Sequence, residues 1–215
     1  MTLLNDLMNR CPGLIVCKLD IQSAVELLTK TYQDGGKLLL CGNGGSSSDC
    51  EHIVGELMKN FMVNRKITES ARKKFLASAS RNGEYIANHL QGALPAISLG
   101  SHTSLVSAFS NDTAADLAFA QQVYGYGKPE DCFLGISTSG NSANIVYAAE
   151  TAKALGLKTI ALTGAAGGML GEVCDVAIKA PSNVTPHVQE HHVSIYHTVC
   201  MILEETFFPA KSGGI

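Results

Sequence analysis

Residues 37–56 read KLLLCGNGGSSSDCEHIVGE, and this stretch decides the fold. Its apolar start at 37–41 is typical of a buried strand, and a helical pattern begins near Ser46. The glycines and the asparagine between them tolerate positive φ angles and let the backbone approach a ligand closely. Because N–H groups at a helix start lack partners within the helix, this strand–loop–helix unit predicts an anion site, for phosphate above all.

His52 and Glu56 follow one turn into the same helix. They are four residues apart and therefore share one face of the helix. An anion site and an imidazole–carboxylate pair on one short element suggest that a phosphorylated substrate is held beside acid–base or metal chemistry.

The composition, with 46% hydrophobic and 16% charged residues, indicates a soluble globular protein. The net charge of −3 gives no electrostatic footprint for nucleic acid. No apolar run approaches the ~20 residues that span a bilayer, and the N-terminus lacks the basic start and apolar stretch of a signal peptide. The seven cysteines form no CxxC pair, so we expect buried thiols in a cytoplasmic protein.

Short apolar runs alternate with helical patterns along the chain. The expected strands are 37–41, 96–99, 132–136, 159–162 and 176–178. The expected helices are 2–10, 20–32, 46–61, 113–124, 142–155 and 188–206. This order predicts an α/β fold, a doubly wound sandwich with a parallel sheet covered on both faces.

The stretch 64–92 interrupts this order. It is polar and basic and holds two helix-like pieces, at 68–80 and 84–90. Its cations are Arg65, Lys66, Arg72, Lys73, Lys74 and Arg81. We favour a solvated surface hairpin or a subunit-contact arm, as is usual for a run of charge in a long connection. The alternative is a lid that supplies a cation to the bound phosphate.

A second Gly/Ser loop, GISTSGNS at 135–142, follows the third expected strand and precedes a helix. Its four hydroxyls and the positive end of the helix again suit a phosphate. Two such loops after two parallel strands can face one crevice, and together they are stronger evidence for a phosphate site than either loop alone. The structural alternative is that both are only helix caps and tight turns. Neither loop matches GxxxxGK[ST] or GxGxxG, which disfavours a nucleoside triphosphate or a dinucleotide.

Three further features carry weaker expectations. The loop TGAAGG at 163–168 is expected only to turn the chain. Asp112 is expected as a helix N-cap more than as a catalytic acid. Gln189 and His197 are about two helical turns apart and can serve one site, whereas His191 and His192 are expected as supporting or interface residues.

Four motifs in order resemble the SIS (sugar isomerase) domain: GNGGSSSD at 42–49, GISTSGNSAN at 135–144, LTGAAGG at 162–168, and the helix with Gln189, Glu190 and His197. More closely, residues 35–207 resemble the phosphoheptose isomerases. The resemblance implies a three-layer α-β-α sandwich with a parallel five-stranded flavodoxin-like sheet. It would comprise an N-terminal helical arm at 1–34 and an SIS domain at 35–215, with a helical insertion at about 64–92. Relatives of this kind are usually homotetramers, so we expect at least a dimer.

The resemblance also implies an activity and roles for individual residues. The reaction would interconvert sedoheptulose 7-phosphate and D-glycero-D-manno-heptose 7-phosphate, or a related sugar phosphate, through a cis-enediol. Glu56 would be the base and His197 its acid/base partner. The residues that would bind the substrate are Asn43, Gly44, Ser46, Asp112, Ser137, Thr138, Ser139, Ser142 and Gln189.

Some relatives bind zinc at the positions of His52, Glu56, Gln189 and His197, and all four residue types are present. Imidazole nitrogens with carboxylate and amide oxygens are reasonable ligands for Zn²⁺. A carboxylate bound to a metal is a poorer base, so for Glu56 both roles stay open.

Two other functions stay open. One is a non-catalytic SIS protein that binds a partner protein, as replication-initiator-binding relatives do; those relatives lack the acid–base pair that Glu56 and His197 supply here. The other is a sensor that binds a sugar phosphate without turnover; sensors commonly carry a DNA-binding domain, and none is evident in this sequence.

Overall fold

The computed structural model describes residues 2–78 and 81–209. Its strands are β1 (Leu38–Gly42), β2 (Ala96–Ser98), β3 (Cys132–Ser137), β4 (Lys158–Thr163) and β5 (Val176–Lys179). Its α-helices are α1 (Thr2–Arg10), α2 (Lys18–Gln33), α3 (Gly45–Met58), α4 (Glu69–Ser78), α5 (Gly83–His89), α6 (Thr103–Phe109), α7 (Ala118–Tyr126), α8 (Ala143–Ala154), α9 (Gly168–Val173) and α10 (Thr185–Phe207). Short tight helices are η1 (Pro12–Cys17), η2 (Leu99–Ser101), η3 (Ser110–Ala114) and η4 (Ala115–Leu117).

The five strands form one parallel sheet in the order β2-β1-β3-β4-β5, so the predicted flavodoxin-like sheet is confirmed. Side chains of successive strand residues point to opposite faces. In β1, Leu38 and Leu40 therefore join one hydrophobic core, while Leu39 and Cys41 join the other. Burial on both faces explains why each strand is a continuous apolar run.

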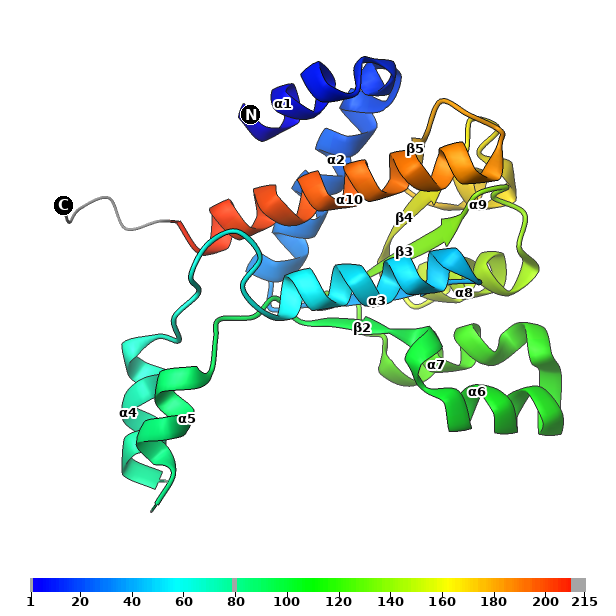
Figure 1. Cartoon of the computed structure of the whole chain (residues 1–215). Helices are drawn as coiled ribbons and strands as arrows, with labels where there is room; N and C mark the ends of the chain where they lie inside the picture. Colours follow the sequence, from blue (N-terminus) through cyan, green and yellow to red (C-terminus); the bar gives the residue numbers. More distant parts are fainter. Residues whose placement is uncertain (1, 79–80, 210–215) are drawn as a thin grey trace.

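Helices cover both faces of the sheet, which makes the predicted three layers (Figure 1). The core on one face includes side chains from α1, α2, α3 and α10. The core on the other face includes side chains from α7, α8 and α9. Because α3 follows β1 and α8 follows β3, the two loops that lead into them lie at the point where the strand order reverses.

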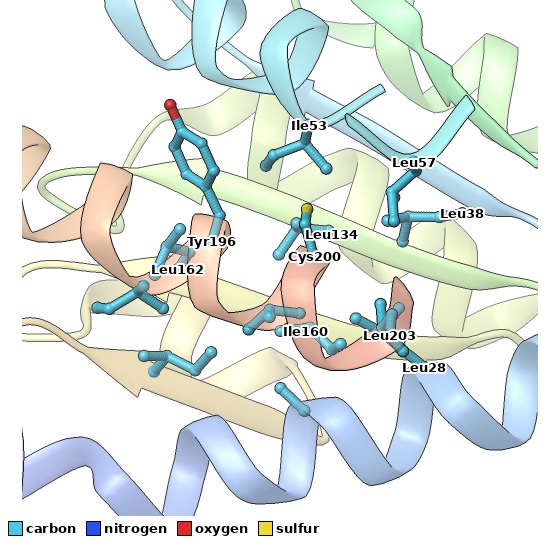
Figure 2. Close-up of a pocket in the computed structure, with 14 residues that line it drawn as sticks. Leu28, Leu38, Ile53, Leu57, Leu134, Ile160, Leu162, Tyr196, Cys200 and Leu203 are labelled. Carbon is cyan, nitrogen blue, oxygen red and sulfur yellow. The ribbon is translucent and has the colours of Figure 1, made fainter. Parts of the chain in front are cut away.

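The first core contains a small apolar cavity of about 30 Å³ between the sheet, α2, α3 and α10 (Figure 2). Such a volume holds about one water molecule, and the cavity wall is apolar, so nothing there suits a sugar phosphate. Tyr196 lines it with its ring, and its hydroxyl points away from the other labelled side chains. Tyr196 thus packs its ring in the core while its hydroxyl lies at the edge of the core.

Helices α4 and α5 form a hairpin, here called the arm (residues 66–91), that projects from the end of α3 (Figure 1). The arm is closed at its base by an antiparallel bridge between Lys66 and Gln91 and by a 2.6 Å bond from the N–H of Gly92 to the carbonyl of Arg65. No side chain of α4 is buried. The arm leaves from the C-terminal end of α3, whereas Ser46 lies at the N-terminal end, so it does not cover the glycine-rich loop of its own chain.

The helix expected at 113–124 is wrong in its first part. Ser110–Ala114 form one wide helical turn, Ala115–Leu117 a tight one, and only Ala118–Tyr126 are α-helical. The cause is the extended backbone of Ala114, with φ −157° and ψ 117°, which a continuous helix cannot contain. The expected N-cap at Asp112 is therefore also wrong, because Asp112 lies inside the wide turn.

Two further findings bear on the expectations from composition. All seven cysteines are free, and six of them are buried. Across the two described ranges, none of the helices combines the length and the apolar character needed to traverse a bilayer.

Candidate active site

The first glycine-rich loop turns the chain sharply from β1 into α3. Gly44 precedes the helix with a φ of 54°, a value that favours glycine. The carbonyls of Asn43 and Gly44 accept the N–H groups of Ser46 and Ser47, both at 3.0 Å. A Cβ on Gly42 would lie 2.5 Å from the carbonyl oxygen of Ser46, so the helix start can pack on the strand end only because residue 42 is glycine.

The second loop presents the four predicted hydroxyls at the end of β3. Ser137 is buried at the last position of the strand, and its Oγ lies 3.1 Å from the Oγ of Ser142, which precedes α8. Thr138 is half-buried and Ser139 is exposed. These hydroxyls stand at the N-terminus of α8, where the helix dipole favours an anion.

The third loop supports the second, as expected for a structural role. The N–H of Leu170 donates to the carbonyl of Gly140 at 2.9 Å, and the N–H of Gly164 donates to the carbonyl of Thr138 at 3.0 Å. Gly140 has a φ of 68° and packs against the backbone of Gly167. The third loop therefore stabilises the left-handed turn of the second loop.

The two loops lie side by side at the carboxyl edge of the sheet. β1 pairs directly with β3 up to Gly42 and Ile136. Beyond that pair, the side-chain amides of Asn43 and Asn144 exchange two hydrogen bonds, of 2.9 and 3.0 Å. The sequence predicted that the two loops face one crevice, and the structure confirms that they lie next to each other.

His52, Glu56 and His197 form a polar cluster between α3 and α10. The Nε2 atom of His52 lies 3.3 Å from Oε1 of Glu56 and 3.4 Å from Nε2 of His197. Glu56 is 9% exposed, and its other oxygen lies 3.5 Å from Nζ of Lys59. The ring of Phe61 packs against His197, with centroids 5.5 Å apart. An imidazole pair thus faces a nearly buried carboxylate.

Tyr196 orients the ring of His52. Its hydroxyl donates to Oδ1 of Asp49 at 3.2 Å and lies 3.0 Å from Nδ1 of His52. Nδ1 of His52 therefore faces the phenol, while Nε2 faces the carboxylate of Glu56 and the ring of His197.

Burial shifts the pKa values of this region. It lowers the pKa of His197, and the nearby His52 adds to this, while Glu56 opposes it. Burial also raises the pKa of Asp49, although the bond from Tyr196 counteracts the rise. A neutral His197 has a lone pair that can accept a proton or bind a metal.

Gln189 lies at the first loop, two turns before His197 on α10. A Cβ on Gly45 would be 2.7 Å from its Nε2, so the amide packs against the loop backbone. His192 faces the sheet instead: it is buried, and its Nε2 bonds the carbonyl of Thr163 at 3.1 Å. His191 is half-buried. Asp112 is exposed and receives a 2.9 Å bond from its neighbour Asn111, so the structure does not bring it to the cluster.

The fit of the cluster to zinc is partial. The described residues contain no group of three or more His, Cys, Asp or Glu side chains already arranged around one metal position. The separations of 3.3 and 3.4 Å nevertheless match the spacing of about 3.3 Å between ligand atoms of a tetrahedral zinc site with ~2.0 Å bonds. The side chains would therefore need to rearrange to share one ion.

Comparison with known proteins identifies the fold family. The profile of the SIS domain matches residues 17–84 and 79–164. The chain belongs to the SIS domain family. It is 40% identical over 191 residues to the phosphoheptose isomerase of Clostridium acetobutylicum, covering 89% of this chain and 84% of that protein. It is 37% identical to the enzyme of Aneurinibacillus thermoaerophilus, again over 191 residues, with coverages of 89% and 83%.

Solved structures agree with this SIS assignment. The phosphoheptose isomerase of Francisella tularensis superimposes with a TM-score of 0.71 at 29% identity, covering 95% of this chain and all of that one. The enzyme of Neisseria gonorrhoeae gives 0.67 at 28% identity, with coverages of 94% and 98%. The overall fold is thus shared with these isomerases over nearly their whole length.

Sequence reasoning did not single out Asp49 and Tyr196 as members of this SIS site. Asp49 lies three residues before His52 on α3, so the helical period could have placed it on the same face. Tyr196 adjoins His197 but is largely in the apolar core, and no local pattern indicates that its hydroxyl reaches His52.

Proposed function

We propose that this SIS protein is a phosphosugar aldose–ketose isomerase. Its substrate would be a heptose 7-phosphate, interconverted between the sedoheptulose and D-glycero-D-manno-heptose forms, or a closely related sugar phosphate. The observation that carries the proposal is the cluster of His52, Glu56 and His197 on α3 and α10, because α3 also begins at the first phosphate loop. The four relatives reported above are phosphoheptose isomerases, and their names support the choice of sugar.

The loops would hold the phosphate. Ser137, Thr138, Ser139 and Ser142 offer hydroxyls at the start of α8, and Ser46 offers one from α3. From Ser46 to His52 the helix rises about 9 Å. The phosphate and the reacting carbons would therefore be several bonds apart, which supports a long sugar chain. Asn43, Gly44 and Gln189 line the first loop, and Asp112 is the weakest candidate because the structure leaves it apart.

Glu56 would move the proton. As a carboxylate it takes the proton from C2 of the aldose, and the C–H electrons form the C1–C2 double bond of a cis-enediol while the C1=O π electrons move onto the oxygen at C1. The proton then returns at C1 as the C2=O bond of the ketose forms. His197 would give a proton to the oxygen at C1 and take one from the oxygen at C2, so protons balance over the cycle. The low exposure of Glu56 keeps bulk water from its oxygens.

We also propose that His52, Glu56, Gln189 and His197 can bind zinc. The donor set and the two short separations among His52, Glu56 and His197 support this. Gln189, whose amide packs on Gly45, would have to turn toward them. When bound, the ion would act as a Lewis acid toward the substrate oxygens. The contact of Tyr196 with Nδ1 of His52 leaves Nε2 as the ring nitrogen that faces Glu56 and His197, where a metal would bind.

We further propose that the protein works in the cytoplasm as a self-assembled oligomer, at least a dimer and by its family a tetramer. The free cysteines support the compartment. Ile15, Val16 and Leu19 are each more than half exposed near the junction of η1 and α2, and such a group of apolar side chains supports a subunit contact. Light scattering on the purified chain measures the assembly.

Proton exchange at C2 tests the function directly. NMR in deuterated water, across a panel of aldose and ketose phosphates, reports the enediol step for whichever sugar is used. We expect Glu56→Gln to abolish the exchange, because an amide cannot take the proton, and to leave sugar-phosphate binding in place. Glu51→Gln, an exposed change on the same helix, is the control. Full exchange in Glu56→Gln would rule out the proposed base.

A further inference from the structure

Arg65 and Glu204 form an ion pair in the interior, away from the substrate loops. Their side chains are 0% and 1% exposed, and Nε of Arg65 lies 2.6 Å from Oε1 of Glu204. Removing two charges from water is costly, and an apolar pair of the same size is often as stable. Stability alone therefore does not explain why this ion pair is buried, and the contacts of the two side chains suggest another role.

The guanidinium of Arg65 binds the end of α3. Its Nη1 donates to the carbonyl of Leu57 and its Nη2 donates to the carbonyl of Glu56, both at 2.7 Å. These carbonyls belong to the last turn of the helix, where the dipole favours a cation. One of the two bonds thus holds the backbone of the proposed base itself.

Glu204 binds the chain that follows α3. Its oxygens accept the N–H groups of Phe61 at 2.9 Å and of Met62 at 2.7 Å, besides the bond from Arg65. Burial opposes the charge of Glu204, yet these bonds lower its pKa on balance. Phe61 in turn packs on His197.

Glu204 is also seven residues after His197 on α10, so the two side chains lie on one face of that helix. The ion pair consequently joins the helix that carries Glu56 to the helix that carries His197, two turns beyond the cluster. We infer that Arg65 and Glu204 are positioning residues that hold Glu56 in register with His197. The inference rests on the proposed isomerase function only for its catalytic consequence.

The geometry requires arginine. The side chain of Arg65 donates three hydrogen bonds from one planar group, to one carboxylate and two carbonyls. A lysine keeps the charge but has a single nitrogen at its end, so it cannot reach all three partners. Arg65→Lys is therefore the informative variant, and Arg72→Lys, on the exposed arm, is its matched control.

The experiment has two readouts. The first is kcat and KM for C2 exchange on the sugar phosphate that the wild type uses best. We expect Arg65→Lys to lower kcat by about 10- to 100-fold, the loss typical of a small misplacement of a reacting group, with KM little changed because the phosphate loops lie at the other end of α3. The second is the imidazole ¹H–¹⁵N NMR spectrum, in which the signals of His52 and His197 should shift. Arg72→Lys should change neither.

A folded Arg65→Lys protein with unchanged kcat and unchanged signals of His52 and His197 would overturn the inference, whatever its melting temperature. If that variant does not fold, the same readouts are made on Glu204→Gln, which keeps the shape and removes the charge. If the wild type exchanges no proton on any sugar, the proposed function fails, while a shift of the two imidazole signals still supports the positioning role.

Discussion

His192 shows how one buried residue can set the response of the fold to acid. It is fully buried, its Nε2 bonds the carbonyl of Thr163, and its Nδ1 has no partner among the described residues. Burial lowers its pKa from 6.5 to about 4. The folded state thus keeps the imidazole neutral where the unfolded chain already binds a proton.

We predict that the free energy of unfolding falls as the pH drops from about 6.5 to 4, because only the unfolded state gains the proton in this range. The loss from this residue should approach about 3 kcal/mol below pH 4. Urea denaturation across the pH range measures it. His192→Gln should flatten the dependence, and His187→Gln, an exposed change, should not. An equally steep dependence in His192→Gln would contradict the assignment.

The proposed zinc ligands also make a prediction at this scale. Metal analysis of freshly purified protein should find about one zinc per subunit, because four ligands complete a tetrahedral site. In a variant without the imidazoles of His52 and His197, the zinc content should be close to zero. The control variant His187→Gln should retain the metal. Finding no zinc in the wild-type protein would remove the metal from the proposal.

Among the elements, the two loops matter as a pair. Each is a short turn at the end of a strand, and neither surrounds a phosphate alone. The amide pair of Asn43 and Asn144 and the adjacent positions of β1 and β3 join them. Affinity for the phosphate should therefore depend on hydroxyls from more than one element.

We predict that Ser137→Ala combined with Ser139→Ala raises KM for phosphorylated sugars at least about tenfold, with a smaller effect on kcat. A hydrogen bond to a charged group contributes about 1.5–3 kcal/mol, and the phosphate is remote from the reacting carbons. Steady-state kinetics measures both constants, and Ser107→Ala, an exposed change on α6, is the control. An unchanged KM would argue against the phosphate role of the second loop.

In the molecule as a whole, the arm is set apart from the sandwich. Neither hydrophobic core includes a residue of 66–91 among the described residues. The two ends of the arm meet at the bridge of Lys66 with Gln91, just beyond Arg65. The direction of the arm favours the surface or subunit-contact interpretation over the lid.

We predict that replacing residues 67–90 by a two-residue Asn-Gly turn leaves the fold intact. Because no side chain of either hydrophobic core cluster is lost, the melting temperature should change by less than about 4 °C, which corresponds to about 1 kcal/mol. Calorimetry measures it, and light scattering of the same sample reports whether the arm contributes to assembly. An unfolded or molten variant would show that the arm is part of the domain.

The sequence by itself determined the parallel sheet, the helices that follow β1 and β3, and the two Ser-rich loops. Apolar runs, helical periods and glycine turns are local properties, so they can be recognised within a few residues of each other. Asp112 shows the limit even of local reasoning, because the extended backbone at Ala114 changes the turn around it.

Only the tertiary structure decided which distant side chains meet. The contact of Tyr196 with His52 and that of Arg65 with Glu204 each join residues more than 130 positions apart. Both depend on how α3 and α10 pack side by side on the sheet, which no local pattern contains. The sequence contains the residues of the proposed acid–base pair, Glu56 and His197, whereas the packing of α3 on α10 brings the two side chains together.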